Sequence, residues 1–237
     1  DVGHTLIFGP TGSGKSTLLA LIAAQFRRYE RAQIFAFDKG NSLLPLTLAA
    51  GGDHYEIGGD AQEEAKALAF CPLSDLTSDA DRAWATEWIE MLVALQGVAI
   101  TPDHRNAISR QVGLMASAAG RSLSDFVSGV QMREIKDALH HYTVDGPMGQ
   151  LLDAEQDGLS LGALQTFEIE HLMNMGERNL VPVLTYLFRR IEKRLDGSPS
   201  LIVLDEAWLM LGHPVFRSKI REWLKVLRKA NCAVVLA

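Results

Sequence analysis

Apolar residues in this chain fall into two kinds of run, and each kind predicts a different element. Short runs rich in β-branched and aromatic residues predict strands, while longer runs with an apolar residue every three or four positions predict helices. The run Gln33–Asp38 is apolar between its ends and finishes in a carboxylate, which is typical of a buried parallel strand. The predicted strands are a short apolar run beginning at His4, Gln33–Asp38, a short strand that follows a turn within Gly51–Ile57, Leu161–Ile169, Ser200–Leu204 and Cys232–Ala237.

From Asp79 to about Leu152 the pattern turns helical. Thr101 followed by Pro102 predicts a helix start, because threonine caps an amino terminus and proline fits the first turn. A stripe that would bury one helix face consists of Trp84, Trp88, Met91, Leu92 and Leu95. Further helices are predicted over Ile108–Ala118, Leu123–Val130 and Gln131–Tyr142. A block of helices between strands of a sheet predicts an inserted α-helical subdomain.

The strands on both sides of this block predict an α/β fold with a mostly parallel central sheet. Helices that could cover the sheet follow the first strand and span Val181–Leu195 and Phe216–Lys229. We therefore expect the first segment of a core domain at residues 1–78, a helical insertion at 79–152, and the second segment of the core at 153–237.

Composition narrows the classes of protein that fit. With 47% hydrophobic residues and a mean hydropathy of +0.05, the chain should bury one substantial core and an appended subdomain. No apolar run reaches the roughly 18 residues of a membrane-spanning helix. The two cysteines, Cys71 and Cys232, lack metal-ligand spacing and fit a reducing cytoplasm. The net charge of -6 disfavours indiscriminate coating of nucleic acid and leaves room for a local basic face.

Candidate chemistry begins in the turn after the first strand, which matches the phosphate-binding pattern G-x-x-x-x-G-K-[ST]. Glycines let successive backbone N–H groups curl around an anion, and the following helix aims its positive dipole end at the same place. Lys15 supplies a charge for the β and γ phosphates, and the Ser16 hydroxyl is the expected Mg²⁺ ligand. The predicted ATP-binding residues are Gly9, Pro10, Thr11, Gly12, Ser13, Gly14, Lys15, Ser16 and Thr17.

A second motif follows the strand Ser200–Leu204, where Asp205 and Glu206 give the pattern of a Walker B strand. Asp205 would hold Mg²⁺, usually through water and opposite the Ser16 hydroxyl. Glu206 would orient and deprotonate the attacking water. The two motifs together predict ATP and Mg²⁺ as cofactors.

Two other polar groups are weighed against simpler explanations. Asp38 would face the phosphates if its strand ends at the ligand crevice, although the residues after it are equally good turn chemistry. His140 and His141 point in different directions on a helix and lack a further ligand at useful spacing. A solvated face is therefore favoured over a metal site at the histidines.

Four cations form a row along the predicted helix Phe216–Lys229, namely Arg217, Arg221, Lys225 and Arg228. The row is either a solvated face or a surface offered to a neighbouring subunit's nucleotide or to a polyanion. In the second case, Arg228 is our first candidate for an arginine finger acting in trans, because it directly precedes the last strand. Arg217 and Arg221 are second choices.

Several classes of phosphate-loop protein lack their signatures here. The chain has no Asn-Lys-x-Asp to read guanine, no Leu-Ser-Gly-Gly-Gln as in transport cassettes, and no evident lid of a small-molecule kinase. A glutamate beside the Mg²⁺ aspartate supports repeated hydrolysis. A RecA-like motor ATPase remains.

The motifs together closely resemble the TrbE/CagE-type conjugal transfer ATPases of type IV secretion systems, and the resemblance covers nearly the whole chain. Its most specific elements are Asp-Glu-Ala-Trp and Trp-Leu-Lys-x-Leu-Arg-Lys. The residues that carry it are Gly3–Thr17, Phe37–Gly40 with Ser42, Pro182–Phe188, Arg190–Glu192, Leu204–Trp208 and Trp223–Asn231.

This resemblance implies a RecA-like C-terminal domain with a helical subdomain, in the ring-forming superfamily that includes FtsK and HerA. It implies ATP hydrolysis that energises pilus assembly and transport of DNA or protein. Implied partners are other subunits of the same protein and components of the secretion channel, at the cytoplasmic face of the bacterial inner membrane. A nucleotide-dependent assembly scaffold and a related ring DNA translocase are the alternatives.

Two features of the family pattern are missing from this chain. One is the N-terminal domain that looks to sit against the secretion channel. The other is a Thr-Gln pair after the last strand, whose glutamine senses the γ-phosphate. The chain also starts just before its first predicted strand and stops within its last, so we expect a piece excised from a larger protein.

Overall fold

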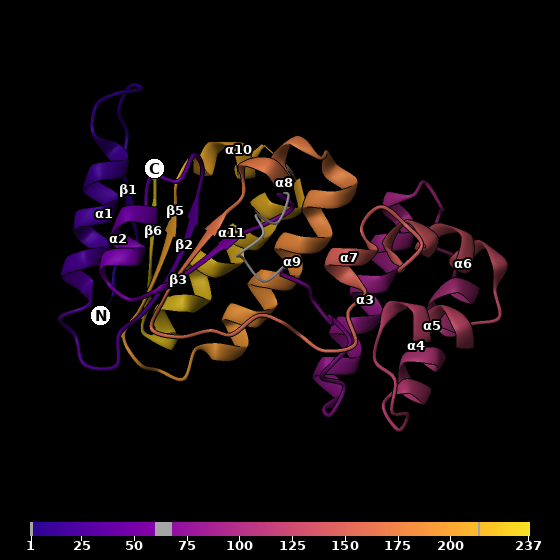
Figure 1. The fold of residues 1–237 in the computed structure, drawn as a ribbon. Coiled ribbons are helices and arrows are strands. Elements are labelled where there is room, and N and C mark those ends of the chain that lie inside the picture. The colour runs from indigo at the N-terminus through magenta and orange to yellow at the C-terminus, as the bar shows by residue number, and fades with distance from the viewer. Residues whose placement is uncertain (1, 60–67, 213) are drawn as a thin grey trace. The chain divides into compact units, whose positions relative to one another are not determined.

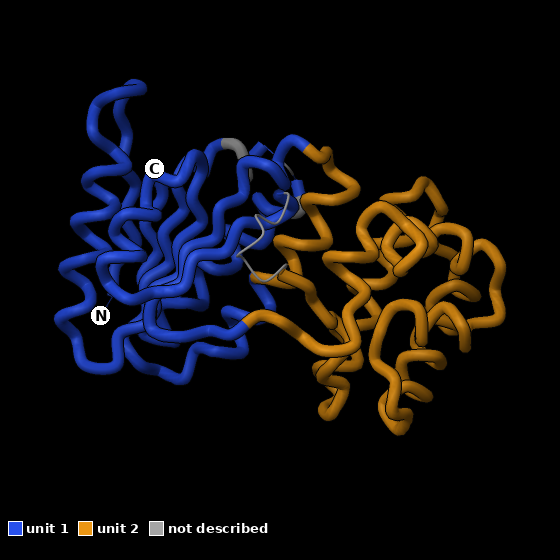
Figure 2. The backbone as a smooth tube through the Cα atoms, viewed as in Figure 1, with its two compact units in different colours: residues 1–59, 160–174, 188–237 blue, residues 60–159, 175–187 orange. Residues whose placement is uncertain are grey.

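The computed structural model describes residues 2–59, 68–212 and 214–237, drawn as a ribbon in Figure 1. The chain separates into two compact units, which Figure 2 colours differently. The core unit consists of residues 1–59, 160–174 and 188–237 and contains every strand found in the described ranges. The helical unit consists of residues 60–159 and 175–187. It therefore includes residues 175–187, which we expected from the sequence to belong to the second segment of the core.

The core unit holds a six-stranded sheet in which each strand runs parallel to its neighbours, in the order β1-β6-β5-β2-β4-β3. This confirms the α/β fold and the parallel sheet predicted from the sequence. The strands are β1 Thr5–Leu6, β2 Gln33–Asp38, β3 Asp53–Glu56, β4 Leu164–Glu168, β5 Ser200–Leu204 and β6 Cys232–Leu236.

The first strand begins at Thr5, one residue after the predicted start, because a side chain replaces the backbone at His4. The N–H of Val234 in β6 donates to Nδ1 of His4 at 3.1 Å, and Nε2 of the same ring lies 3.0 Å from the Leu224 carbonyl oxygen. The strand register with β6 spans Thr5 and Leu6, and the Ile7 N–H also donates to the Leu236 carbonyl at 2.8 Å.

Helices cover both faces of this sheet (Figure 1). Helices α1 (Lys15–Phe26) and α2 (Leu44–Ala49) lie over one face, where Leu19 of α1 is fully buried in a cluster with Ala36 of β2. Side chains alternate along a strand, so the next residue, Phe37, faces the opposite layer.

That opposite layer is aromatic. Helix α9 (Glu177–Arg194) places Phe188 5.3 Å from the Phe37 ring centroid and 4.4 Å from the ring of Trp223. Trp223 belongs to helix α11 (Pro214–Val226), which continues as a 3₁₀ turn, η2, over Leu227–Ala230. The predicted helix Phe216–Lys229 is thus an α-helix followed by a tighter turn. Short helices α8 (Glu170–Asn174) and α10 (Ala207–Leu211) complete the core unit as described.

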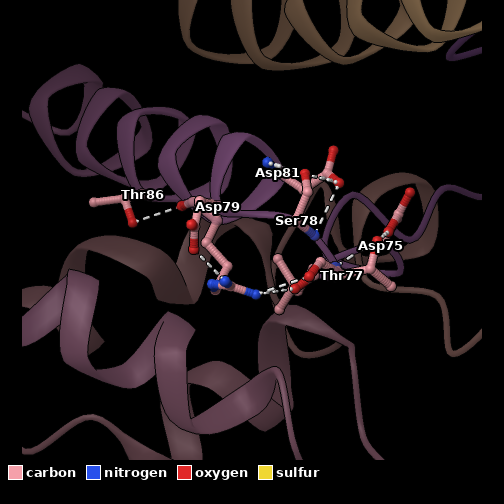
Figure 3. Close-up of polar contacts among 8 residues, drawn as sticks. Asp75, Thr77, Ser78, Asp79, Asp81 and Thr86 are labelled. Carbon is pink, nitrogen blue, oxygen red and sulfur yellow. Dashed lines mark hydrogen bonds and ion pairs between the residues drawn. The ribbon is translucent and has the colours of Figure 1, made fainter.

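Three helices of the helical unit begin with a capping box. Ser78, Thr101 and Ser122 each accept a backbone N–H from the third residue of the helix that follows, and that residue's side chain returns the bond. Figure 3 shows the Ser78 example. The start predicted at Thr101 and Pro102 is confirmed. The helices are α3 (Asp79–Leu95), α4 (Pro102–Met115), α5 (Leu123–Gly129), α6 (Arg133–Leu139), the 3₁₀ turn His140–Tyr142 and α7 (Gly149–Leu152).

The predicted stripe on α3 is partly buried as expected, with Trp88 only 2% exposed. His141 Nε2 lies 2.7 Å from the Asn179 side-chain oxygen within the helical unit.

No helix within the described ranges is long and apolar enough to cross a bilayer.

Candidate nucleotide site

The phosphate-binding pattern lies in the loop between β1 and α1, and its glycines are required by the path of the backbone. Gly12 and Gly14 have φ of 79° and 86°, a left-handed conformation that glycine adopts without a Cβ clash. A Cβ added to Gly9 would lie 2.5 Å from the Ser13 hydroxyl oxygen. The loop therefore needs glycine at positions 12 and 14, and a side chain at position 9 would displace the Ser13 hydroxyl.

Helix α1 begins without a side-chain cap, because its N-cap residue is Gly14. The first-turn N–H groups of Lys15, Ser16 and Thr17 have no partner inside a helix and gain none from the cap. The Lys15 ammonium group folds back over the loop, where Nζ donates to the carbonyl oxygens of Gly9 at 3.0 Å and Pro10 at 3.2 Å. Such a cluster of N–H donors beside one cation is suited to phosphate oxygens.

Asp205 follows the carboxyl end of β5 and is tied to the loop helix by one short bond. The Ser16 hydroxyl donates to Asp205 Oδ2 at 2.9 Å, and the Glu206 backbone N–H donates to Asp205 Oδ1 at 3.0 Å. The Asp205 side chain is buried, with 3% of the residue exposed. Hydroxyl and carboxylate oxygens at this separation are the donors that Mg²⁺ prefers, since it takes few protein ligands and keeps several waters.

Asp38 ends β2 at the same edge of the sheet and holds the loop that follows it. Its Oδ1 accepts the Ser42 hydroxyl at 2.5 Å and its Oδ2 accepts the Leu43 N–H at 2.7 Å. The Ser42 oxygen also lies 3.3 Å from Asp205 Oδ2. Ser42 therefore connects the two buried carboxylates.

Glu168 is a carboxylate at this edge that we did not predict from the sequence. It lies opposite Asp38 in the β2–β4 register and is 3% exposed. Its oxygens accept the backbone N–H groups of Asn41 at 2.6 Å and Glu170 at 2.8 Å, so both brace loops. The only signal in the sequence was a charged residue near the end of a predicted strand.

Glu206 lines a cavity beside the loop. Its φ is 53°, which is unusual for a residue with a side chain, and its Oε2 accepts the indole N–H of Trp208. The cavity has a volume of about 410 Å³, and Gly9, Lys15, Glu206 and Trp208 are among the residues that line it.

The basic row, Arg217, Arg221, Lys225 and Arg228, is not gathered at the phosphate loop. Arg217, at the start of α11, donates from Nε to the Leu211 carbonyl at 3.0 Å and so caps α10. Arg228 lies in η2, just before the amino end of β6. The phosphate loop follows the carboxyl end of β1, and β1 and β6 are parallel. Lys15, Asp38 and Asp205 thus lie at the carboxyl ends of the strands, and Arg228 lies at their amino ends.

Comparisons with known proteins agree with these features. No family model matches the chain. The chain is 92% identical over 237 residues to a probable conjugal transfer protein TrbE of Sinorhizobium fredii and 85% identical over 239 residues to "Conjugal transfer protein TrbE" of Rhizobium radiobacter. Each match covers 100% of this chain but only 36% and 29% of those proteins. The chain therefore spans about a third of the length of these relatives.

More distant matches extend the comparison. "Type IV secretion system protein virB4" of Bartonella henselae is 26% identical over 244 residues, covering 100% of this chain and 30% of that protein. The structure of VirB4 of Thermoanaerobacter pseudethanolicus has a TM-score of 0.72 at 14% identity, covering 98% of this chain and 68% of that one, and it supports the fold. The resemblance to TrbE/CagE-type conjugal transfer proteins is confirmed, and this chain is similar along its whole length to a segment of TrbE.

Proposed function

We propose that this chain is the ATP-hydrolysing motor region of a type IV secretion or conjugation protein. The observation that carries the proposal is the hydrogen bond between Ser16 and Asp205. It places two oxygen ligands suited to Mg²⁺ side by side at the phosphate loop. The Glu206 backbone N–H binds the other oxygen of Asp205, and Glu206 lines the cavity beside the loop. The similarity to TrbE along the whole chain supports the same function independently of the geometry.

ATP would bind with its β and γ phosphates in the loop from Gly9 to Thr17. Lys15 would exchange two neutral carbonyl acceptors, those of Gly9 and Pro10, for charged phosphate oxygens, which form stronger hydrogen bonds with an ammonium group. The Ser16 hydroxyl and, usually through water, the Asp205 carboxylate would hold Mg²⁺. When bound, the ion neutralises charge on the transferring phosphoryl group.

Hydrolysis would use Glu206 as the general base. A water oxygen bonds to the γ-phosphorus while the bond from that phosphorus to the bridging oxygen breaks. The water proton passes to the Glu206 carboxylate, and ADP leaves with the electron pair of the broken bond. Asp205 is held by the Ser16 hydroxyl and the Glu206 N–H, so its role in holding the metal is separate from proton transfer. Asp38 and Ser42 support this edge by keeping the loop after β2 in place.

Arg228 would act between subunits. It lies at the edge of the sheet opposite the phosphate loop of its own chain, so it could stabilise a transferring phosphoryl group only in a neighbouring copy. Arg221 and Lys225, in α11 directly before this turn, are also exposed. We therefore propose a ring of subunits at the cytoplasmic face of the bacterial inner membrane. Secretion-channel components are its partners, and DNA or protein is its cargo.

Phosphate release by the purified protein tests this function. Lys15→Ala should abolish ATP binding or hydrolysis, because the loop keeps its N–H groups but loses its mobile cation. Lys136→Ala, which removes a lysine of α6 in the helical unit, is the matched control and should keep full turnover. Unchanged turnover in Lys15→Ala, with the control also active, would overturn the assignment of the site.

A further inference from the structure

The backbone that carries Glu206 is fixed on both sides, but these backbone contacts do not set the direction of the carboxylate. The Glu206 N–H is bound to Asp205 Oδ1 at 3.0 Å, and the Ala207 N–H is bound to the Ala237 carbonyl at 2.8 Å. A φ of 53° at a residue with a side chain costs free energy and persists only where the surroundings hold it. The backbone after β5 therefore has a fixed direction. The glutamate side chain has further rotatable bonds, so the backbone alone does not place its carboxylate.

One side chain settles the direction of that carboxylate. The indole N–H of Trp208 donates to Glu206 Oε2. A tryptophan N–H can only donate a hydrogen bond, so the orientation of the indole ring identifies its acceptor.

Burial does not explain where the Trp208 ring lies. Trp208 is 64% exposed, whereas Trp88 and Trp223 are 2% and 0% exposed. The N–H of Trp223 also meets a glutamate, Glu192, at 2.6 Å, but that ring is held by the aromatic layer under α11. Trp208 makes its bond from a solvent-exposed position, so the bond to Glu206 is a main reason for its orientation.

Both residues line a cavity beside the phosphate loop. Glu206 and Trp208 line the same cavity of about 410 Å³ as Lys15 and the first residues of the phosphate loop. The indole N–H takes one acceptor position on Oε2, and Oε1 can accept a proton.

We propose that Trp208 is a positioning residue for hydrolysis, which holds the Glu206 carboxylate toward the attacking water through its indole N–H. This inference rests on the proposed function, because it gives Glu206 the role of general base. A hydrogen bond to a charged group reduces the number of rotamers that the carboxylate samples, so its loss lowers the rate of the chemical step and leaves ATP affinity unchanged.

A double-mutant cycle tests the proposal. Trp208→Phe keeps an aromatic ring and removes the N–H donor, and it is combined with Glu206→Gln. ATP turnover is measured under multiple-turnover conditions, and with radiolabelled ATP in single turnovers where the rate is low. Trp84→Phe, the same change on α3 of the helical unit, is the matched control. Melting temperatures by circular dichroism show that each variant is folded.

Trp208→Phe alone should lower kcat about tenfold with KM within about twofold, and Trp84→Phe should change neither. In the Glu206→Gln background the same change should alter residual turnover by less than about twofold, because no base remains to be positioned. Equal losses in both backgrounds, a rise in KM instead of a fall in kcat, or no loss at all would each overturn the inference. Unchanged turnover in Glu206→Gln alone would overturn the proposed role of Glu206 itself, which distinguishes the two failures.

Discussion

Ser16 and Asp205 are 189 positions apart in the chain, yet the Ser16 hydroxyl oxygen lies 2.9 Å from Asp205 Oδ2. The contact joins the first turn of α1 to the carboxyl end of β5. It places a hydroxyl and a carboxylate where a small, hard cation can take one oxygen from each, directly or through water.

Removing this hydroxyl should weaken the response to Mg²⁺. In Ser16→Ala, the Mg²⁺ concentration for half-maximal ATP hydrolysis should rise by about 10- to 100-fold, because one ligand and the partner of Asp205 are lost together. A Mg²⁺ titration at fixed ATP measures it. Ser16→Thr keeps a hydroxyl and should stay close to the unmodified protein. Equal Mg²⁺ requirements in Ala and Thr variants would show that Ser16 is not a ligand.

Glu206→Gln should separate binding from hydrolysis. The amide keeps the size of the side chain but cannot take up the water proton, so kcat should fall by about 10² to 10⁴ while ATP affinity stays within about twofold. Phosphate release and a fluorescent-nucleotide titration measure the two quantities. A collapse of ATP affinity would instead show that Glu206 is structural.

Glu168→Gln is the matched control for that change, because it neutralises another carboxylate at the same edge of the sheet. Both Glu168 oxygens accept backbone N–H groups, so the variant should melt at a lower temperature and keep turnover within a few fold. A loss of turnover as large as that of Glu206→Gln, at an unchanged melting temperature, would assign Glu168 a role in the chemistry.

Arg228→Ala should reveal whether the site is completed by a neighbouring subunit. An arginine finger in trans is worth about 10³ to 10⁵ in rate, so the specific activity of the unmodified protein should rise steeply with its concentration. Arg228→Ala should remove that rise and leave Mg-ATP binding intact. Lys225→Ala, which removes an exposed cation of the neighbouring helix α11, serves as the comparison. Turnover that is independent of concentration, and unaffected by Arg228→Ala, would leave the basic row as a solvated face.

The two cysteines should make stability fall at alkaline pH. Burial raises the pKa of the Cys232 thiol to about 12, and burial with nearby carboxylates raises the pKa of Cys71 to about 11. Unfolded thiols ionise at a pKa of about 8.5, so the folded state holds these protons more tightly. The resulting stability is fully present below that pH and is lost as the pH rises toward 11 and 12.

Urea unfolding of the unmodified protein and Cys232→Ala measures this effect. At pH 7 the unmodified protein should be the more stable of the two. By about pH 10.5 the gap should have narrowed by about 3 kcal/mol, because only the unmodified protein loses the Cys232 thiol contribution. A gap that stays constant with pH would contradict a raised pKa at Cys232.

The sequence was informative where chemistry depends on neighbours in the chain. The glycines before α1, the Asp205–Glu206 pair and the cap at Thr101 are local patterns whose backbone demands can be read in order. Glu168 could not be assigned, because the N–H groups that it accepts, from Asn41 and Glu170, are brought together by the pairing of β2 with β4.

Two other features also depend on long-range contacts. Arg228 lies at the amino ends of the strands because β6 runs parallel to β1. The local sequence does not predict that direction. The grouping of residues 175–187 with the helical unit is visible only in contacts such as the Trp88 indole N–H on the Pro182 carbonyl at 3.2 Å.

The position of β6 between β1 and β5 has a consequence for the order in which the protein can be made. Thr5 pairs with Val235, and among the described strands β1 has no other partner. During synthesis the phosphate loop leaves the ribosome long before the strand that anchors it. The pairing of β1 with β6 can form only after Cys232–Leu236 has emerged, which makes it a late contact between residues far apart in the sequence.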